Sequence, residues 1–184
     1  MKYLNIFSPL LLLALVLICY SLLLQPSYGV PSEILLAICS NTTNQKQCES
    51  ILTNEPATST ADLYKLSLIS TELLQKQAKS NLQTYKEFRE NTTSSHDAAL
   101  KKAFDDCIED YEGAESHIEI ARQLSLKGRY QETFDKFSLA LKLAEHCLAG
   151  IPLNNNHSVS CTSGPYNSFS LLIEISENVN RLLA

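Results

Sequence analysis

Apolar residues recur at spacings of three and four along most of the chain beyond residue 30, and no stretch shows the strict alternation of a strand. Glycine is scarce, with 5 in 184 residues. Two short helical patterns cover 32–38 and 45–52, and four longer ones begin near residues 61, 97, 130 and 166. The connections between the first three long patterns are short, which favours up-down-up-down packing. The sequence therefore predicts an all-α four-helix bundle preceded by a helical hairpin.

Each long pattern predicts a set of core residues. Gly128 is expected to end the second long helix, and Gly150-Ile151-Pro152 the third. The seams mix large residues with alanine, as in a filled core, which argues against a hollow bundle that binds a small apolar ligand. In chain order, the inward residues are expected to be Leu63, Leu66, Ile69, Leu73, Leu74, Ala78, Leu82 and Tyr85, then Leu100, Phe104, Cys107, Tyr111, Ala114, Ile118 and Ala121, then Tyr130, Phe134, Phe137, Leu141, Ala144 and Leu148, and finally Phe169, Leu172, Ile173, Val179 and Leu182.

Four cysteines lie within or beside these helices. A bridge between Cys39 and Cys48 would tie the two short helices into the hairpin. Cys107 lies on the seam of the second long helix and Cys147 near the end of the third. A bridge between them would join two neighbouring helices and close a loop of about 40 residues, worth roughly 3 to 4 kcal/mol in the chain-entropy model. Cys161 lies in a polar stretch without an evident partner, and we expect it either free or paired between chains.

The first 29 residues have the order of an export signal. A basic start at Lys2 is followed by an apolar run over 10–24 and by small residues at Ser27 and Gly29. The run is too short to span a bilayer, which needs about 20 apolar residues, and no second such run follows. We expect cleavage after Gly29 and a secreted protein that does not associate with a membrane.

Three acceptor sequons for N-glycosylation support the secretory route, at Asn41, Asn91 and Asn156. Each falls where the apolar periodicity is interrupted, as a glycan on a surface loop requires. The chain beyond residue 29 is long enough for one domain. We expect that domain to cover 30–184, with the hairpin at 30–56 and the bundle at 60–184, and we expect a monomer.

Charge and motif content exclude several classes of function. The full chain has a formal net charge of −5, so nucleic acid and anionic membranes are poor partners. The sequence has no CxxC, P-loop or GxGxxG motif. His146 beside Cys147 is a poor catalytic pair, because adjacent residues of a helix point about 100° apart. We expect no catalytic residue, metal or cofactor, and a protein that acts by binding another protein. The histidines are scattered, at His96, His117, His146 and His157.

The segment 105–119 is unusually acidic and contains no lysine or arginine. Like charges recur at i, i+4, and each such pair costs roughly 0.2 to 0.5 kcal/mol of helix stability. Two interpretations remain open: a solvated face of the bundle, or a face that meets a basic partner and tolerates self-repulsion for it. Its acids are Asp105, Asp106, Glu109, Asp110, Glu112, Glu115 and Glu119.

Five short motifs occur in a fixed order over nearly all of the chain beyond the export signal. They are Ile38-Cys39 to Cys48 with eight residues between, Ser59-Thr60-Ala61-Asp62-Leu63, Ala99-Leu100 to Asp106-Cys107 with Tyr111 and Ala114, Gly128-x-Tyr130 nineteen residues before Cys147, and Ile175-Ser176-Glu177-Asn178. In this order they resemble the plant invertase and pectin methylesterase inhibitor family. The resemblance implies disulfides Cys39–Cys48 and Cys107–Cys147. It also implies a non-catalytic inhibitor of a plant carbohydrate enzyme, located in the apoplast or the vacuole.

The resemblance also suggests the target. In pectin methylesterase inhibitors of this family, polar and acidic residues of the middle helices cover the enzyme's substrate cleft. Invertase inhibitors of the family instead carry Pro-Lys-Phe at the start of the third long helix, where this chain reads Tyr130-Gln131-Glu132, and the later Asp135-Lys136-Phe137 is expected to be buried in a helical turn. This favours pectin methylesterase, although Leu148-Ala149 stands where those inhibitors often have acids. The candidate partner-binding residues are Asp106, Glu109, Asp110, Glu112, Gly113, Ser116 and His146.

Two alternatives remain open at this point. One is an inhibitor of cell-wall or vacuolar acid invertase, a β-fructofuranosidase. The other is a non-inhibitory secreted protein that binds a ligand or serves a structural role. An assay of the purified protein against both enzymes separates these alternatives.

Overall fold

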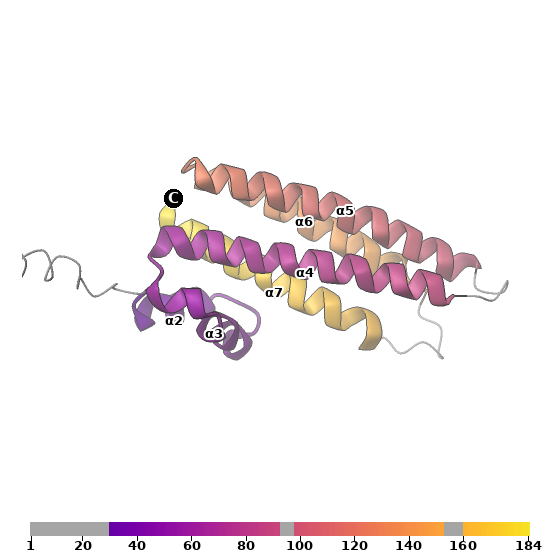
Figure 1. Ribbon diagram of the computed structural model, residues 1–184, viewed down its shortest axis with the longest axis horizontal. Helices are drawn as coiled ribbons and strands as arrows, with labels where there is room; N and C mark the ends of the chain where they lie inside the picture. The colour runs from indigo at the N-terminus through magenta and orange to yellow at the C-terminus, as the bar shows by residue number, and fades with distance from the viewer. Residues whose placement is uncertain (1–29, 93–97, 153–159) are drawn as a thin grey trace, which may run out of the picture.

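A computed structural model describes residues 30–92, 98–152 and 160–184, with side chains from residue 164 onward in the last range. Its elements are α2 (Ser32–Cys39), α3 (Gln45–Asn54), the 3₁₀ helix η1 (Pro56–Thr60), α4 (Leu63–Asn91), α5 (Ala98–Leu126), α6 (Tyr130–Gly150) and α7 (Ser160–Leu183). The four long helices run up-down-up-down, and each packs on two neighbours (Figure 1). The hairpin of α2 and α3 lies beside the bundle, against α7. The predicted all-α fold is confirmed.

Some predictions concern parts of the chain that lie outside the described residues. These are the export signal at 1–29 and the sequon at Asn156, together with the thiol of Cys161. Among the helices that the structure does describe, none is long and apolar enough to cross a membrane.

Short polar side chains and one glycine fix the helix ends. Asp62 caps α4, its side chain accepting a hydrogen bond from the Lys65 amide at 2.7 Å. At the end of α5, Gly128 has a φ of +70°, and its amide donates to the Ser125 carbonyl. The Arg129 amide donates to the Leu124 carbonyl, which completes a Schellman motif. Gly128 therefore ends α5 as predicted, and α6 can start two residues later.

The last helix differs from its prediction in its start and in the orientation of one residue. It begins at Ser160 rather than near residue 166 and carries Pro165 within it. The Pro165 carbonyl accepts a hydrogen bond from Asn81 Nδ2 at 3.0 Å, which holds this early turn against α4. Leu182 was expected to face inward, but it is 50% exposed. The buried stripe passes through Val179 and Asn180, so Leu182 points to one side of it.

The seam of α6 is also offset from its prediction. Phe134, Leu141 and Leu148 are only half-buried, whereas Thr133 and Ala140 are buried. The fully buried positions 133, 137, 140, 144 and 147 repeat in steps of four and three, as a bundle seam should. Thr133 can be buried because its hydroxyl donates to the Tyr130 carbonyl. The expectation that 135–137 is buried holds for Phe137 but is wrong for Asp135, which is exposed.

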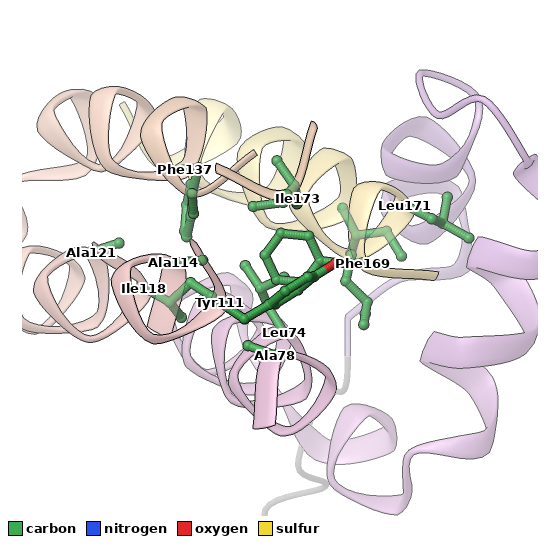
Figure 2. Close-up of a cluster of buried hydrophobic side chains, with 14 of the residues drawn as sticks. Leu74, Ala78, Tyr111, Ala114, Ile118, Ala121, Phe137, Phe169, Leu171 and Ile173 are labelled. Carbon is green, nitrogen blue, oxygen red and sulfur yellow. The ribbon is translucent and has the colours of Figure 1, made fainter. Parts of the chain in front are cut away.

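Aromatic rings fill one half of the bundle core. Tyr85 of α4 stacks on Tyr111 of α5, with ring centroids 5.4 Å apart. Phe169 of α7 meets Tyr111 edge-on at 5.4 Å (Figure 2). Such pairs add about 0.5 to 1.5 kcal/mol beyond the area that they bury. Residues from three helices therefore meet at Tyr111, which the predicted seam of α5 contains.

The other half of the core holds a buried polar cluster that the sequence patterns did not predict. Asn180 Oδ1 accepts hydrogen bonds from the hydroxyls of Ser67 and Ser125, at 3.0 and 3.1 Å. Its Nδ2 donates to the Ser176 carbonyl at 2.7 Å. Ser67, Ser125 and Asn180 are fully buried and belong to three different helices. The cluster therefore ties α4, α5 and α7 at one longitudinal position.

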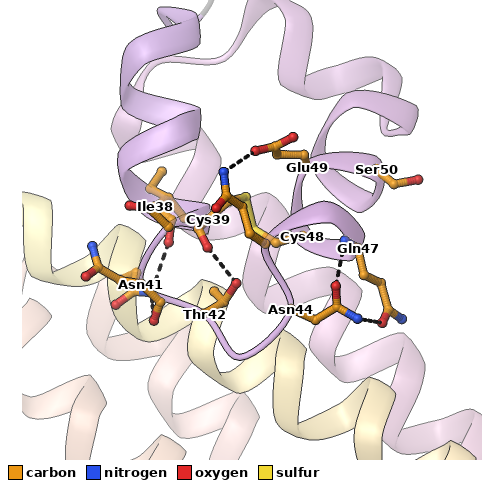
Figure 3. The surroundings of a disulfide bond; sticks show 12 residues. Ile38, Cys39, Asn41, Thr42, Asn44, Gln47, Cys48, Glu49 and Ser50 are labelled. Carbon is orange, nitrogen blue, oxygen red and sulfur yellow. Dashed lines mark hydrogen bonds between the residues drawn. A yellow bond between two sulfur atoms is a disulfide. The ribbon is translucent and has the colours of Figure 1, made fainter.

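The hairpin is closed by a disulfide and docked on α7 by polar contacts. Cys39 and Cys48 are bonded, with Cα atoms 5.4 Å apart (Figure 3). Asn178 Nδ2 donates to the carbonyls of Ile38 and Asn41 at 3.1 and 3.2 Å. The Thr43 amide donates to the Glu174 carboxylate at 2.6 Å. The loop of the hairpin is thus fixed to the bundle on the side away from α5.

Candidate functional site

The two middle helices, α5 and α6, make the closest pair in the bundle. The disulfide Cys107–Cys147 joins them with Cα atoms 4.5 Å apart, in agreement with the pairing that the resemblance implies. One turn and a half further along α5, a Cβ built on Gly113 would lie 3.0 Å from Leu143 Cδ1. A glycine at this position therefore leaves room for the Leu143 side chain to pack against α5. The outward surface of α5 and α6 is in consequence carried on a rigid, covalently linked pair.

The side of the acidic segment that faces α4 is neutralised within the chain. Glu115 pairs with Lys79 at 3.4 Å, Glu112 with Lys86 at 3.5 Å, and Asp105 with Arg89 at 2.8 Å. These three ion pairs join α4 to α5 at successive positions, as the antiparallel register of the two helices requires. Each is exposed and contributes at most about 1 kcal/mol. The repulsion expected within α5 is thus offset by basic groups of α4.

The side that faces α6 carries the one buried charged residue of the described chain, Asp110, which is 7% exposed. Its carboxylate lies 2.8 Å from His146 Nδ1 on α6. The His146 side chain itself is 73% exposed. The hydrogen bond that His146 donates to Asp110, together with the negative charge of this carboxylate, raises the pKa of His146 above the ordinary histidine value. A buried anion and an exposed imidazole are therefore coupled across the α5–α6 seam.

Between these two sides lies the outward stripe of α5. Glu109 and Ser116 are exposed on it, and Ile120 follows one turn later with 40% exposure. On α6, Leu139 is 38% exposed and lies seven residues before His146, on the same side of the helix. We define Glu109, Ser116, Ile120, Leu139 and His146 as the outer α5–α6 face. It combines an acid and an imidazole at one end with apolar groups at the other.

The structure brings most of the predicted partner-binding residues to this region. Asp106, Asp110, Gly113 and His146 line the α5–α6 seam, and Asp106 is paired with Lys102 at 2.7 Å. The remaining candidates, Glu109, Glu112 and Ser116, are exposed on α5, with Glu112 turned toward Lys86.

Sequence reasoning missed Ile120 and Leu139, as well as the bases of α4. The bases could have been found, because Lys79, Lys86 and Arg89 face Glu115, Glu112 and Asp105 once the two helices are aligned antiparallel.

Other kinds of site find no support in the described residues. No group of three His, Cys, Asp or Glu side chains within these ranges could hold a metal ion. Cys147 is bonded to Cys107, so it offers no thiol next to His146. A groove of about 460 Å³ lies between α3, α4 and α7, lined by Ile51, Leu73 and Leu172 among others. It is a surface groove beside the hairpin rather than a hollow core.

Comparison with known proteins decides the family. A family model described as plant invertase/pectin methylesterase inhibitor matches residues 33–178, well over half of the chain. The chain belongs to this family. The family model describes inhibitors rather than catalysts, which agrees with the prediction that the chain is not an enzyme.

Two curated relatives support the family assignment. A pectinesterase inhibitor of Actinidia deliciosa is 29% identical over 119 residues, which cover 65% of this chain and 63% of the relative. Pectinesterase inhibitor 2 of Arabidopsis thaliana is 29% identical over 111 residues, covering 60% of this chain and 62% of the relative. The aligned part of the chain thus spans slightly less than two thirds of either relative.

Solved structures show the same fold. The crystal structure of mutant form A of a pectin methylesterase inhibitor from Arabidopsis superposes with a TM-score of 0.71, covering 84% of this chain and 99% of that one. A further crystal structure of a pectin methylesterase inhibitor from Arabidopsis thaliana gives a TM-score of 0.61 over the same shares. Both are 22% identical to this chain, so the likeness is one of fold.

Proposed function

We propose that this family member is a secreted inhibitor of pectin methylesterase that covers the enzyme's substrate cleft with its outer α5–α6 face. The observation that carries the proposal is the family match over residues 33–178, together with two curated relatives that are both pectinesterase inhibitors. Inhibition then requires no chemistry from the chain. It requires a stable surface large enough to exclude a polysaccharide.

The dimensions of the middle helices come close to those of an ordinary interface. The 21 residues of α6 give a length of about 30 Å, and two adjacent helices are about 20 Å wide. The projected area, about 600 Å², approaches the roughly 800 Å² that each partner buries in an ordinary stable interface. The disulfide and the packing of Leu143 over Gly113 keep this surface preorganised, which lowers the entropy lost on binding.

The start of α6 supports pectin methylesterase over invertase as the target. The position where invertase inhibitors of the family carry Pro-Lys-Phe is occupied by Tyr130, Gln131 and Glu132. Glu132 forms an ion pair with Arg129, so an acid stands near the place of the expected lysine. The place of the lysine itself is taken by the uncharged Gln131, so an invertase site that accepts a lysine would find no cation there.

Two of the three predicted glycans, those at Asn41 and Asn91, would leave the outer α5–α6 face open. Asn41 is exposed on the hairpin loop, and Asn91 is exposed at the end of α4. Neither asparagine lies on α5 or α6. A glycan at either position would extend from a different part of the surface, which is compatible with docking through the middle helices.

Activity assays against two enzymes test this proposal. The purified, disulfide-bonded protein is titrated into a plant pectin methylesterase and, separately, into a plant acid invertase. We expect saturable loss of esterase activity at near-equimolar inhibitor and unchanged invertase activity. Inhibition of invertase alone would establish the alternative target, and no effect on either enzyme would establish a non-inhibitory role.

A further inference from the structure

We propose that the protonated His146 ring is a recognition element of the outer α5–α6 face, donating from Nε2 to a carboxylate or carbonyl oxygen of the target enzyme. This rests on the proposed function and concerns its regulation, because the contact exists only in one protonation state of the ring. The inhibitor would bind more tightly when the ring is protonated than when it is neutral.

The geometry determines which ring nitrogen responds to pH. His146 Nδ1 lies 2.8 Å from Asp110 Oδ2, and a carboxylate accepts a hydrogen bond but does not donate one. Nδ1 therefore carries its hydrogen in both states of the ring. Protonation takes place at Nε2, which accepts a hydrogen bond in the neutral ring and donates one in the imidazolium. A partner oxygen at Nε2 is thus attracted after protonation and repelled before it.

The burial of Asp110 makes this orientation stable. An ionised carboxylate that is 7% exposed requires a hydrogen-bond partner, and His146 is the partner that the described residues provide. Loss of the pair would leave a buried charge uncompensated. The ring is consequently held in one position before any partner arrives, while most of its surface remains exposed for contact. Such preorganisation favours binding because little side-chain entropy is lost.

The charges around His146 favour the imidazolium. From α5, Asp110 and Asp106 both raise its pKa, and the hydrogen bond that the ring donates to Asp110 is the largest cause. On α6 itself, Glu145 precedes it and contacts the Tyr166 hydroxyl of α7 at 3.5 Å, while Lys142 lies one turn earlier. Lys102 offsets part of the Asp106 charge. Position 146 is also close to the end of α6, where the helix dipole stabilises a cation.

The sign of the pH effect follows from the raised pKa. The ring carries its charge below that pKa and loses it as the pH rises through a value above about 6.5, the ordinary histidine value. The contact at Nε2 is therefore present below the raised pKa of His146 and is lost as the pH rises through it. The outer α5–α6 face carries the acid Glu109 and, below its pKa, the cationic ring of His146. Such a face is complementary to an enzyme surface that presents a basic group to Glu109 and an acceptor oxygen to His146.

The test compares affinities across pH. His146→Asn keeps a donor that can reach Asp110 but removes Nε2 and the positive charge. Lys142→Gln is the control, because it removes a nearby exposed cation that does not titrate in this range. Dissociation constants for a plant pectin methylesterase are measured by biolayer interferometry from about pH 5 to about pH 8, on either side of the histidine range. Titration of the enzyme affects all inhibitors equally, so the ratio of variant to wild-type constants isolates the substituted residue.

We expect the His146→Asn ratio to be about tenfold at the acidic end, the worth of one charge-assisted hydrogen bond, and to fall to about one at the alkaline end. The Lys142→Gln ratio should stay constant. A His146→Asn ratio that does not change with pH would overturn the inference while leaving the proposed function intact. If the wild type fails to bind the esterase at every pH, the proposed function fails instead.

A second measurement needs no enzyme. The His146 ring protons of the free protein are followed by NMR as the pH changes, in the wild type and in Asp110→Asn. The neutral asparagine is nearly isosteric, and it should lower the pKa of His146 because the charged hydrogen bond is gone. An unchanged titration would show that Asp110 does not hold the ring, and the mechanism proposed for Nε2 would be wrong.

Discussion

Removing the disulfide between α5 and α6 should destabilise the protein more than removing the disulfide of the hairpin. The perturbations are the double variants Cys107→Ala/Cys147→Ala and Cys39→Ala/Cys48→Ala. The four cysteines are buried to almost the same degree, between 0 and 2% exposed, so the loss of packing on truncation is similar in both variants. The difference that remains is the length of the loop each bridge closes, 40 against 9 residues in sequence separation.

The expected magnitudes follow from loop-closure entropy. In the chain-entropy model, a 40-residue loop contributes about 3.9 kcal/mol at 25 °C and a 9-residue loop about 2.6 kcal/mol. The bundle bridge should therefore be worth about 1.3 kcal/mol more than the hairpin bridge. For a chain of this size 1 kcal/mol shifts the melting temperature by about 2 to 4 °C, so the two variants should differ by roughly 3 to 5 °C.

Urea denaturation followed by circular dichroism measures these losses. The slope of the transition is fitted together with the midpoint, because a change in slope would reveal a more compact or more expanded unfolded state. Equal losses in the two variants, or a larger loss in the hairpin variant, would refute the reasoning. In that event, strain or residual structure in the unfolded chain, rather than loop entropy, would govern the contribution of the bridges.

Three further predictions follow from particular contacts. Asn180→Ala should lower the free energy of unfolding by about 2 to 4 kcal/mol in the same denaturation assay, because it leaves the buried hydroxyls of Ser67 and Ser125 without their acceptor, and a loss below 1 kcal/mol would contradict the network. Gly128→Ala should cost about 1 kcal/mol, because alanine is strained at a φ of +70°, and calorimetry that finds it neutral would show that the turn relaxes freely. Inhibition of pectin methylesterase should weaken as salt is raised from low to about 0.5 M, because charges on an exposed face are screened within about 8 Å at physiological ionic strength, whereas a salt-independent inhibition constant would show that contacts other than charges dominate.

Much of the fold could be predicted from the sequence because local signals and the bundle geometry agree. The seam of α5 is a regular alternation of steps of three and four, and the predicted residues of that seam from Phe104 to Ala121 are all buried. Gly128 could be identified as a helix terminator, since only glycine adopts a positive φ without cost. The spacing of apolar residues identified the buried face of a helix correctly where that face is defined by its apolar residues, as in this part of α5.

The errors arose where polar residues are buried. Thr133 on α6 and Asn180 on α7 are buried and form hydrogen bonds inside the bundle. A prediction that counts only apolar residues as buried therefore places the inward face of these helices slightly to one side of its true position. The start of α7 was missed because it lies in a polar stretch and contains Pro165, which ordinarily favours the first turn of a helix. Among the residues that the structure describes, a tertiary contact, the hydrogen bond from Asn81, supports that turn.

The candidate site shows the same limit. The acidic residues of 105–119 could be recognised on one helix, but which neighbour each acid faces depends on the register of α4, α5 and α6. That register pairs Glu112 and Glu115 with lysines of α4 and buries Asp110 against His146. Charge reversal at Asp110 would therefore test folding as much as binding, whereas Glu109 is exposed and forms no ion pair among the described residues.

The central claim is that the outer α5–α6 face contacts the target enzyme, and a matched pair of charge reversals tests it most directly. Glu109→Lys changes this face, and Glu90→Lys makes the same change at an exposed glutamate of α4, a different helix. The inhibition constant of each variant for pectin methylesterase is measured beside the wild type, with melting temperatures to verify the fold. We expect Glu109→Lys to raise the constant by about tenfold or more, as the loss of a complementary charge and a new repulsion would do, and Glu90→Lys to leave it unchanged. Equal inhibition by both variants and the wild type would contradict the account, and the contact surface would then have to lie on other helices.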